Sequence, residues 1–470
     1  MQRELHVFID IDRAPVLVGR LWARERSGHA TSSFTYHSSW LTRRGAFALA
    51  PSLMLSRGQF NSSQPLFNAF SDSAPDTWGR RLMRRHERAR AGQAGTQPRT
   101  LLDIDFLIGV DDQTRLGALR FKEPTSQTFL TATGRPVPPL IELATLLSVT
   151  ERFERGRETD EDVLLVLAPG TSLGGARPKA TVRDKNGRLL VAKFPKRDDE
   201  WPMTRWEATA LSLAEAAGIV VPEWRLDNVA RRPILMLYRF DRVGVDVRVP
   251  YMSAFTALDA VDHDKQQRSY LELVDVLRQE GSAPEKDLKQ LWRRLIFNIL
   301  ISNTDDHLRN HAFLRDAKGW RLSPAYDLNP CPTDVRPRVH ALAIDELDGT
   351  ASLEVAYSVA PSFGMNRNEA TSMAAEVGAA VEQWREVAKS FGLKPTDADR
   401  MASAFEHDDL RKALSGRTTP ARGARHRNGR GKRQVIDEHH GGKTDRRRAS
   451  PRSLSKKGTA ATTSRNTDLA

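Results

Sequence analysis

Residues 303–310 of the chain read Asn303-Thr304-Asp305-Asp306-His307-Leu308-Arg309-Asn310, and Pro324-Ala325-Tyr326-Asp327 follows them after a short hairpin-like segment. The stretch supplies a carboxylate at Asp305 and an amide at Asn310, and the second segment ends in another carboxylate, Asp327. One carboxylate can accept the proton of an incoming hydroxyl, while an amide oxygen and a second carboxylate can bind Mg²⁺ against phosphate groups. These three residues therefore form a candidate unit for phosphoryl transfer.

The sequence around this unit has the order of elements found in the catalytic half of a protein kinase. There, an Asp is followed after four residues by an Asn, and a metal-binding Asp lies on the next loop. Residues 287–301 predict a helix that leads into the loop, with Arg293, Arg294 and Asn298 largely off its apolar stripe. After the loop, 312–314 and 320–322 flank a turn-forming segment and predict a hairpin. The stripe consists of Leu288, Leu291, Trp292, Leu295 and Ile299.

Two other interpretations of the loop stay open on the sequence alone. In the first, residues 303–305 only end the preceding helix and Asp327 only caps a turn. In the second, His307 and His311 share a helical face and bind a metal, as in a metal hydrolase. The second interpretation lacks a third ligand and the Glu of the His-Glu-x-x-His pattern.

A glycine-rich loop and a buried lysine lie upstream. Residues 168–179 contain Gly170, Gly174 and Gly175, whose backbone N–H groups could approach anionic oxygens, although the loop matches neither common phosphate-binding pattern. Residues 189–194 predict a buried strand with a single lysine, Lys193, whose charge needs a partner. Glu207 is the candidate partner, and the alternative is that Thr204 and Glu207 form a capping box for a helix closed by Gly218.

With these residues in view, the chain resembles the HipA family, the serine/threonine kinase half of bacterial toxin–antitoxin pairs. The resemblance extends from near the N-terminus to about Leu414, and the joint order of its motifs is more specific than any one of them. The motifs are Phe70-Ser71-Asp72-Ser73-Ala74-Pro75-Asp76, Phe106-Leu107-Ile108-Gly109-Val110-Asp111-Asp112, Gly117-Ala118-Leu119-Arg120-Phe121, 172–179, Arg239-Phe240-Asp241-Arg242 and the two loops quoted first.

The resemblance implies a set of roles. Asp305 would be the proton acceptor, Asn310 and Asp327 would bind magnesium, and Ser172 would be the loop serine whose autophosphorylation inactivates the kinase. Tyr238 stands where the family commonly has Glu, and Arg177-Pro178 replaces the more usual Gln-Glu. ATP would contact Gly174, Gly175, Ala176, Arg177, Pro178, Lys179, Lys193, Tyr238, Arg239, Phe240, His307, Leu308, Arg309, Asn310 and Asp327, with 238–240 as the hinge beside adenine.

The resemblance also implies partners: a helix-turn-helix antitoxin like HipB, and a protein substrate for which an aminoacyl-tRNA synthetase is the family's expectation. DNA would be contacted indirectly, through the antitoxin. The alternative is a catalytically silent, DNA-associated corepressor, which the complete set of Asp305, Asn310, Asp327 and Lys193 disfavours.

Composition agrees with a large enzyme of the cytoplasm. The 470 residues are 39% hydrophobic, which suffices for sizeable cores. No apolar run approaches the roughly 20 residues of a membrane span, and the N-terminus begins with a strand-like pattern rather than a signal peptide. The one cysteine, Cys331, fits a reducing compartment.

The excess positive charge belongs to the last part of the chain. Residues 417–470 contain 15 Lys or Arg against four Asp or Glu, while the whole chain has a net charge of +13. These residues include few large apolar groups, so the sequence predicts a disordered basic tail. Such a tail could bind nucleic-acid phosphates weakly, but aromatic residues that would stack on bases are absent from it.

The predicted architecture is a two-lobed, kinase-like α/β (α+β) fold. Its parts are a β-rich N-terminal subdomain at 1–125, a nucleotide-binding lobe at 126–245, a mainly helical catalytic lobe at 246–415 and the tail at 416–470. Within the first part, strands are expected at 5–10, 14–21 and 33–36. Ser73-Ala74-Pro75-Asp76 predicts the start of a short helix with Pro75 in its first turn.

Overall fold

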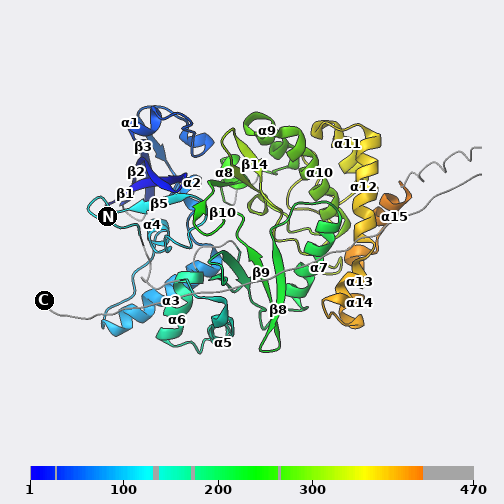
Figure 1. Cartoon of the computed structure of the whole chain (residues 1–470), viewed down its shortest axis with the longest axis horizontal. Helices are drawn as coiled ribbons and strands as arrows, with labels where there is room; N and C mark the ends of the chain where they lie inside the picture. Colours follow the sequence, from blue (N-terminus) through cyan, green and yellow to red (C-terminus); the bar gives the residue numbers. More distant parts are fainter. Residues whose placement is uncertain (1, 27–28, 131–136, 171–174, 263–265, 417–470) are drawn as a thin grey trace, which may run out of the picture. The chain divides into compact units, whose positions relative to one another are not determined.

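The first strands of the chain build an antiparallel sheet (Figure 1). Its strand order is β4-β3-β2-β1-β5. The bounds are Gln2–Ile11 for β1, Ala14–Arg26 for β2, His29–Tyr36 for β3, Gln59–Ser62 for β4 and Leu119–Lys122 for β5. Alternate residues of β1, Leu5, Val7 and Ile9, are buried, as expected for a sheet with one face on the core. The three strands predicted in this region are confirmed with longer bounds.

The computed structural model describes residues 2–26, 29–130, 137–170, 175–262 and 266–416. The predicted basic tail, the loop serine Ser172 and Gly174 lie outside these ranges.

The helix predicted near Pro75 differs from the prediction. It is α3, Thr77–Gln93, and Asp76 is its N-cap, so Pro75 precedes the helix instead of standing in its first turn. The Asp76 side chain accepts a hydrogen bond of 2.9 Å from the Gly79 N–H, which fixes the start of the helix. The helix is also long, at 17 residues. Its neighbours in this part of the chain are α1 (Ser38–Leu41), η1 (Pro51–Leu53), α2 (Asn68–Ser71) and α4 (Asp103–Ile108).

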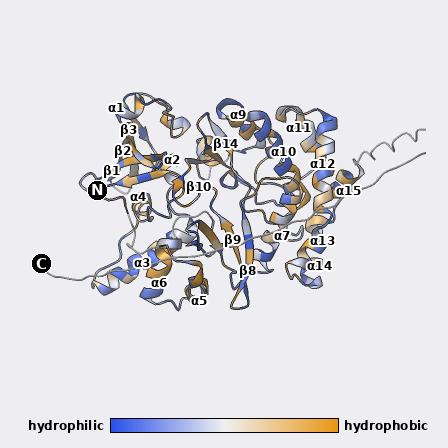
Figure 2. Ribbon diagram, in the orientation of Figure 1, coloured by the Kyte–Doolittle hydropathy of each residue, from blue (hydrophilic) through white to orange (hydrophobic). Residues whose placement is uncertain are grey.

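A second antiparallel sheet carries the predicted lysine strand. Its order is β6-β7-β9-β8, with β6 at Lys179–Arg183, β7 at Leu189–Lys193, β8 at Trp224–Val229 and β9 at Arg232–Tyr238. Strand β9 is strongly hydrophobic (Figure 2). This composition suits a strand that is covered by other residues on both faces. Ile234 and Met236 belong to the hydrophobic cluster that includes α5 and α6, whereas Leu235 and Leu237 belong to the one that includes α7. The helices in this part of the chain are η2 (Leu140–Glu142), α5 (Leu143–Glu154), α6 (Asp160–Gly170) and α7 (Met203–Ala216).

The C-terminal part is mainly helical, and α10, Pro284–Leu300, runs through its core (Figure 1). All five residues of the predicted stripe are buried, but so are Arg294 and Asn298, which were expected off it. These two polar side chains face other buried polar groups, so the helix is covered on more sides than one stripe implies. The other helices are α8 (Ala254–Ala257), α9 (Tyr270–Glu280), η3 (Leu308–Asn310), α11 (Leu353–Val359), η4 (Ala360–Phe363), α12 (Arg367–Val381), α13 (Trp384–Ser390), α14 (Pro395–Phe405) and α15 (Asp408–Ser415).

The predicted hairpin is present as β13, Ala312–Arg315, and β14, Trp320–Leu322. The Asp316 N–H donates to the Gly319 carbonyl at 2.9 Å and closes the turn. Strand β12, Tyr251–Ser253, extends this sheet, and β10 (Arg242–Val243) pairs with β11 (Val247–Arg248). The hairpin thus separates the Asp305 loop from Asp327.

The predicted fold class is confirmed: the chain is a mixed α/β protein with sheet in its N-terminal region and helices in its C-terminal region. The boundaries at residues 125 and 245 stay predictions. Among the described residues, no helix is both long and apolar enough to cross a bilayer.

Candidate active site

Lys193 is bound by the partner that the sequence indicated. It ends strand β7, and its Nζ lies 2.5 Å from Glu207 Oε1. Glu207 is buried on α7 and does not cap that helix, whose N-cap is Pro202 without a side-chain cap bond. The capping-box alternative is therefore wrong, while the predicted end of the helix is confirmed, since Gly218 follows it with φ of +72°.

Asp327 joins this ion pair from the other side. Its Oδ1 lies 2.9 Å from Lys193 Nζ. The Lys193 ammonium, outweighing burial, keeps the pKa of Asp327 below its usual range. Burial by itself would lower the pKa of Lys193, but the carboxylates of Asp327 and Glu207 raise it above its usual value. Lys193 is thus a permanently charged cation between two carboxylates, and Asp327 has a positive φ of 60°, an uncommon backbone conformation found at constrained sites.

Asn310 lies beside Asp327. Its Nδ2 is 3.5 Å from Asp327 Oδ2, and its own Oδ1 is buried without a hydrogen-bond partner among the described residues. A buried amide oxygen without a partner is costly, and the amide group to which this oxygen belongs lies next to the Asp327 carboxylate. Carboxylate and amide oxygens are ligands that Mg²⁺ takes, so the two side chains fit a magnesium site.

Asp305 lies on the exposed side of the same loop. Its side chain is 69% exposed, and its Oδ1 is 2.7 Å from Nη1 of Arg336, on the segment that follows Asp327. The loop starts directly after α10, whose C-cap is Ile301. A hydroxyl on another molecule can therefore reach Asp305 from solvent.

The metal-hydrolase interpretation does not fit this geometry. His307 is exposed, whereas His311 is buried with its Nε2 2.8 Å from Asp306 Oδ2. The two histidines flank the short turn η3 rather than sharing a helical face. Within the described ranges, no group of three His, Cys, Asp or Glu residues is placed to bind a metal.

Asp306 is a site residue that the sequence analysis missed. Besides His311 it accepts a hydrogen bond from the hydroxyl of Tyr270 on α9, and all three side chains are buried. Burial by itself would raise the pKa of the Asp306 carboxyl, but His311 and the hydrogen bond from Tyr270 together with other nearby charges lower it. The sequence signal that could have identified Asp306 is that a second carboxylate directly follows Asp305. The sequence does not show which of the two side chains is buried.

The described part of the glycine-rich loop carries Lys179 at its end. Lys179 is buried, and its Nζ lies 3.3 Å from Asp76 Oδ2. Arg177 instead forms an ion pair with Asp199, so its side chain is engaged away from Lys179. The carbonyl of Pro178 accepts a hydrogen bond from the Phe194 N–H at 3.0 Å, which fixes the loop's end beside β7.

The expected hinge, 238–240, also serves to join two parts of the chain. The Arg239 guanidinium is buried and donates to Asp241 and to the carbonyls of Thr114 and Arg115. The Arg239 side chain is therefore engaged in this contact, and the expected contact of 238–240 with adenine stays a prediction that concerns the backbone. Tyr238 donates from its hydroxyl to Asp184 at 3.3 Å, and the Phe240 ring stacks on Tyr326 with centroids 5.4 Å apart.

His307, Leu308 and Arg309 differ in their burial and in their contacts. Leu308 is buried, and Arg309 is exposed and lies over the Phe255 ring while pairing with Asp262 at 2.9 Å. The charge of His307 lies near enough to Asp327 to affect its pKa.

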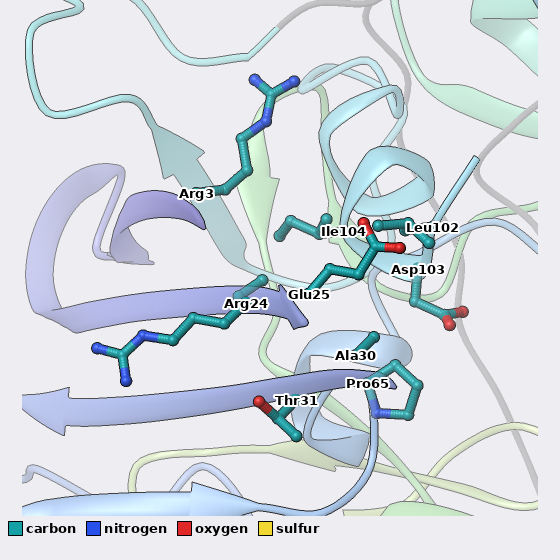
Figure 3. A pocket seen from close by; sticks show the side chains of 10 residues that line it. Arg3, Arg24, Glu25, Ala30, Thr31, Pro65, Leu102, Asp103 and Ile104 are labelled. Atoms are coloured by element: carbon teal, nitrogen blue, oxygen red, sulfur yellow. The ribbon is translucent and has the colours of Figure 1, made fainter. Parts of the chain in front are cut away.

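A hollow on the N-terminal sheet lies away from these residues. Figure 3 shows the side chains that line it, among them Arg3, Thr31 and Ile104, and none belongs to the predicted site. It is formed by β1, β2, β3 and the start of α4.

Two family models match the chain. The model described as the HipA-like C-terminal domain matches residues 171–400, which include the Lys193, Asp305 and Asp327 segments. The model described as the HipA N-terminal domain matches residues 10–104.

Individual proteins and a solved structure are also similar to the chain. Two Sinorhizobium fredii proteins, Y4mE and Y4dM, each named as a candidate kinase, are both 29% identical to the chain, over 146 and 199 residues. The matches cover 29% and 36% of this chain and only 33% and 48% of those proteins. A structure of the Shewanella oneidensis HipA, HipB and operator DNA complex includes a chain with the same fold, at a TM-score of 0.56 and 16% identity, covering 88% of this chain and 96% of that one.

Proposed function

The chain belongs to the HipA family, and from this premise we propose that it is a serine/threonine protein kinase that uses ATP and Mg²⁺. The observation that carries the proposal is the position of Lys193 between Glu207 and Asp327, with Asn310 beside Asp327. A lysine fixed by a glutamate on a neighbouring helix, close to a metal-binding aspartate, is the arrangement with which kinases bind nucleotide phosphates.

Asp305 would act on the acceptor. Its carboxylate accepts the proton of the substrate hydroxyl as the hydroxyl oxygen attacks the γ-phosphorus of ATP, and the bond from that phosphorus to the β–γ bridging oxygen breaks to release ADP. The side chain is exposed enough for a loop of another protein to reach it. Arg336 fixes the direction of the carboxylate through Oδ1.

Asn310 and Asp327 would bind Mg²⁺, which when bound neutralises charge on the phosphates. Lys193 would bind phosphate oxygens on the same side, and its pairing with Glu207 holds the ammonium in place. Gly174 to Lys179 would line the nucleotide, the backbone of 238–240 would lie beside adenine, and Ser172 would be the autophosphorylation site.

The biological role proposed is that of the toxin in a type II toxin–antitoxin pair, acting in the cytoplasm. The Shewanella complex with HipB and operator DNA supports a helix-turn-helix antitoxin as partner and an indirect association with DNA. An aminoacyl-tRNA synthetase is the proposed substrate class. Mass spectrometry of the chain incubated with Mg²⁺ and ATP, before and after addition of a synthetase mixture, tests Ser172 and the substrate separately.

The experiment that decides between a kinase and a silent corepressor is ATP turnover by the purified chain. We expect Mg²⁺-dependent formation of ADP and phosphoprotein, lost in Asp305→Asn and in Asp327→Ala. Equal activity in the wild type and in both variants would assign the turnover to a contaminant and overturn the proposal. No turnover by a folded wild-type chain that still binds an antitoxin would favour the corepressor.

A further inference from the structure

Two lysines lie opposite each other on neighbouring strands of the second sheet. Lys179 on β6 and Lys193 on β7 are partners in the antiparallel register. Side chains directly opposite in such a pair project from the same face of the sheet, about 5 Å apart at Cβ, and like charges in that position repel. Two ammonium groups can be kept there only if each has a counter-charge.

Each lysine has its own carboxylate, from an element outside the sheet. Lys193 pairs with Glu207 of α7, as described above. Lys179 pairs with Asp76, the N-cap of α3, at 3.3 Å, and their side chains are only 5% and 11% exposed. A buried ammonium without a partner is strongly unfavourable, so this contact differs from an exposed surface pair.

Helix α3 also holds the backbone of the glycine-rich loop. The Trp78 N–H donates to the Gly175 carbonyl at 3.4 Å, and Trp78 Nε1 donates to the Lys179 carbonyl at 3.0 Å. Before the loop, Gly170 packs so closely that a Cβ there would lie 2.6 Å from Leu82 of the same helix. The start of α3 therefore sets the position of both ends of the loop.

From these contacts we propose that Asp76 is a positioning residue of the phosphate site, which keeps Lys179 charged and directed toward the nucleotide phosphates as Glu207 does for Lys193. The inference rests on the proposed function. It adds that the N-terminal region supplies part of the nucleotide site, because Asp76 and Lys179 are separated by 103 positions in the sequence.

The charges around Lys179 agree with this role. Burial lowers the pKa of Lys179, the charge of Asp76 opposes that effect most, and Lys193 and Asp327 are near enough to contribute. Burial likewise raises the pKa of Asp76 to about 6, against the effect of Lys179. Removing the Asp76 carboxylate would leave Lys179 with the repulsion of Lys193 and without its closest counter-charge.

Asp76→Asn separates the electrostatic role from the structural one. Asn is as good an N-cap as Asp, so the bond to the Gly79 N–H can remain while the charge is lost. Binding is measured by titration calorimetry of the full chain with Mg²⁺ and the non-hydrolysable ATP analogue AMPPNP, and with adenosine, which lacks phosphates. We expect the Kd for AMPPNP to rise about tenfold and the Kd for adenosine to stay within about twofold.

Two further variants complete the design. In a Lys179→Met background, Asp76→Asn should cause no additional loss of AMPPNP affinity, because Asp76 acts through Lys179. Asp103→Asn is the matched control: it removes a carboxylate of α4 that pairs with Arg80 of α3 at 2.7 Å, and it should leave both Kd values unchanged. If Asp76→Asn does not fold, Asp76→Ser keeps a capping oxygen without the charge.

The outcomes distinguish the two proposals. An unchanged Kd for AMPPNP in Asp76→Asn, equal weakening for AMPPNP and adenosine, or a full additional loss in the Lys179→Met background would each overturn the role of Asp76 and leave the kinase proposal intact. Failure of the folded wild-type chain to bind AMPPNP at all would overturn the proposed function itself.

Discussion

Asp305 and Asp306 are neighbours in the sequence but lie in opposite environments: the Asp305 side chain is 69% exposed, and the Asp306 side chain is 4% exposed. Asp305 pairs with Arg336 at the surface, whereas Asp306 pairs with His311 in the interior. One loop thus exposes one carboxylate to solvent and is anchored in the interior by the next one. The two residues should respond to the same substitution in different ways.

Asp305→Asn should reduce the rate of phosphorylation by about 10²–10⁴-fold, because the amide cannot accept the hydroxyl proton. The free energy of unfolding should change by less than about 0.5 kcal/mol, since the pair with Arg336 is exposed. Single-turnover kinetics and urea unfolding measure the two effects. Wild-type activity in this variant would remove Asp305 from the mechanism.

Asp306→Asn should instead lower the free energy of unfolding by about 3 kcal/mol. The substitution leaves His311 and Tyr270 without the buried carboxylate that both contact. Activity should fall as well, because the loop that carries Asp305 and Asn310 loses its anchor. A stability equal to that of the wild type, measured by urea unfolding beside Asp305→Asn, would contradict this account.

Asp327→Ala should weaken the binding of Mg²⁺ with a nucleotide by at least about tenfold, as measured by titration calorimetry. The substitution removes both the proposed magnesium ligand and a counter-charge of Lys193. The control is Asp408→Asn, which removes an exposed carboxylate paired with Arg411 on α15 and should have no effect. A Kd that is independent of Mg²⁺ in the wild type would contradict the metal site. His311→Ala is unsuitable as a control, because His311 is buried against Asp306.

Two buried histidines should contribute less to the stability of the fold as the pH drops from 6.5 toward 4. Burial lowers the pKa of both His340 and His407 from 6.5 to about 4, so below pH 6.5 the unfolded chain binds protons that the folded chain does not. The stabilising effect of these neutral histidines is therefore complete above pH 6.5 and is lost as the pH falls to about 4. The part due to His340 should be about 3 kcal/mol over this window.

The test compares urea unfolding at several pH values in the wild type and in His340→Gln. The variant should show a shallower dependence on pH, whereas His29→Gln, at an exposed position, should follow the wild type. An unchanged slope in His340→Gln would contradict the assignment.

A chain that ends at Gly416 should fold and retain its activity. Its last helix, α15, ends at Ser415 with Gly416 as C-cap, and Leu410 and Ala413 of that helix are buried. The 54 residues removed carry 15 Lys or Arg and few large apolar groups, so they contribute little to a core. Any affinity for nucleic acid should decrease and lose its dependence on salt. Loss of folding, followed by circular dichroism, would show that the boundary is misplaced.

Much of the region around the candidate active site follows from local sequence. The helix before the loop, the hairpin after it and the lysine strand are set by apolar periodicity and turn residues, which act over a few neighbouring positions. The spacing of Asp305 and Asn310 and the place of Asp327 are likewise visible in the sequence. The pairing of Lys193 with Glu207 was one of two possibilities on that basis, and the structure decided it.

Tertiary structure alone decided which charged groups meet. Helix α3 packs against the start of β6 and so brings Asp76 and Trp78 to Lys179. The residues near Lys179 in the sequence do not indicate a partner that lies 103 positions earlier. In the same way, the tertiary structure buries Asp306 and leaves Asp305 exposed. It also places the Arg239 guanidinium where it donates to the carbonyls of Thr114 and Arg115. A sequence pattern specifies the direction of side chains only relative to their own helix or strand, whereas the partner of a buried charge depends on how distant elements pack, since the cost of an unpaired buried charge is set by its whole surroundings.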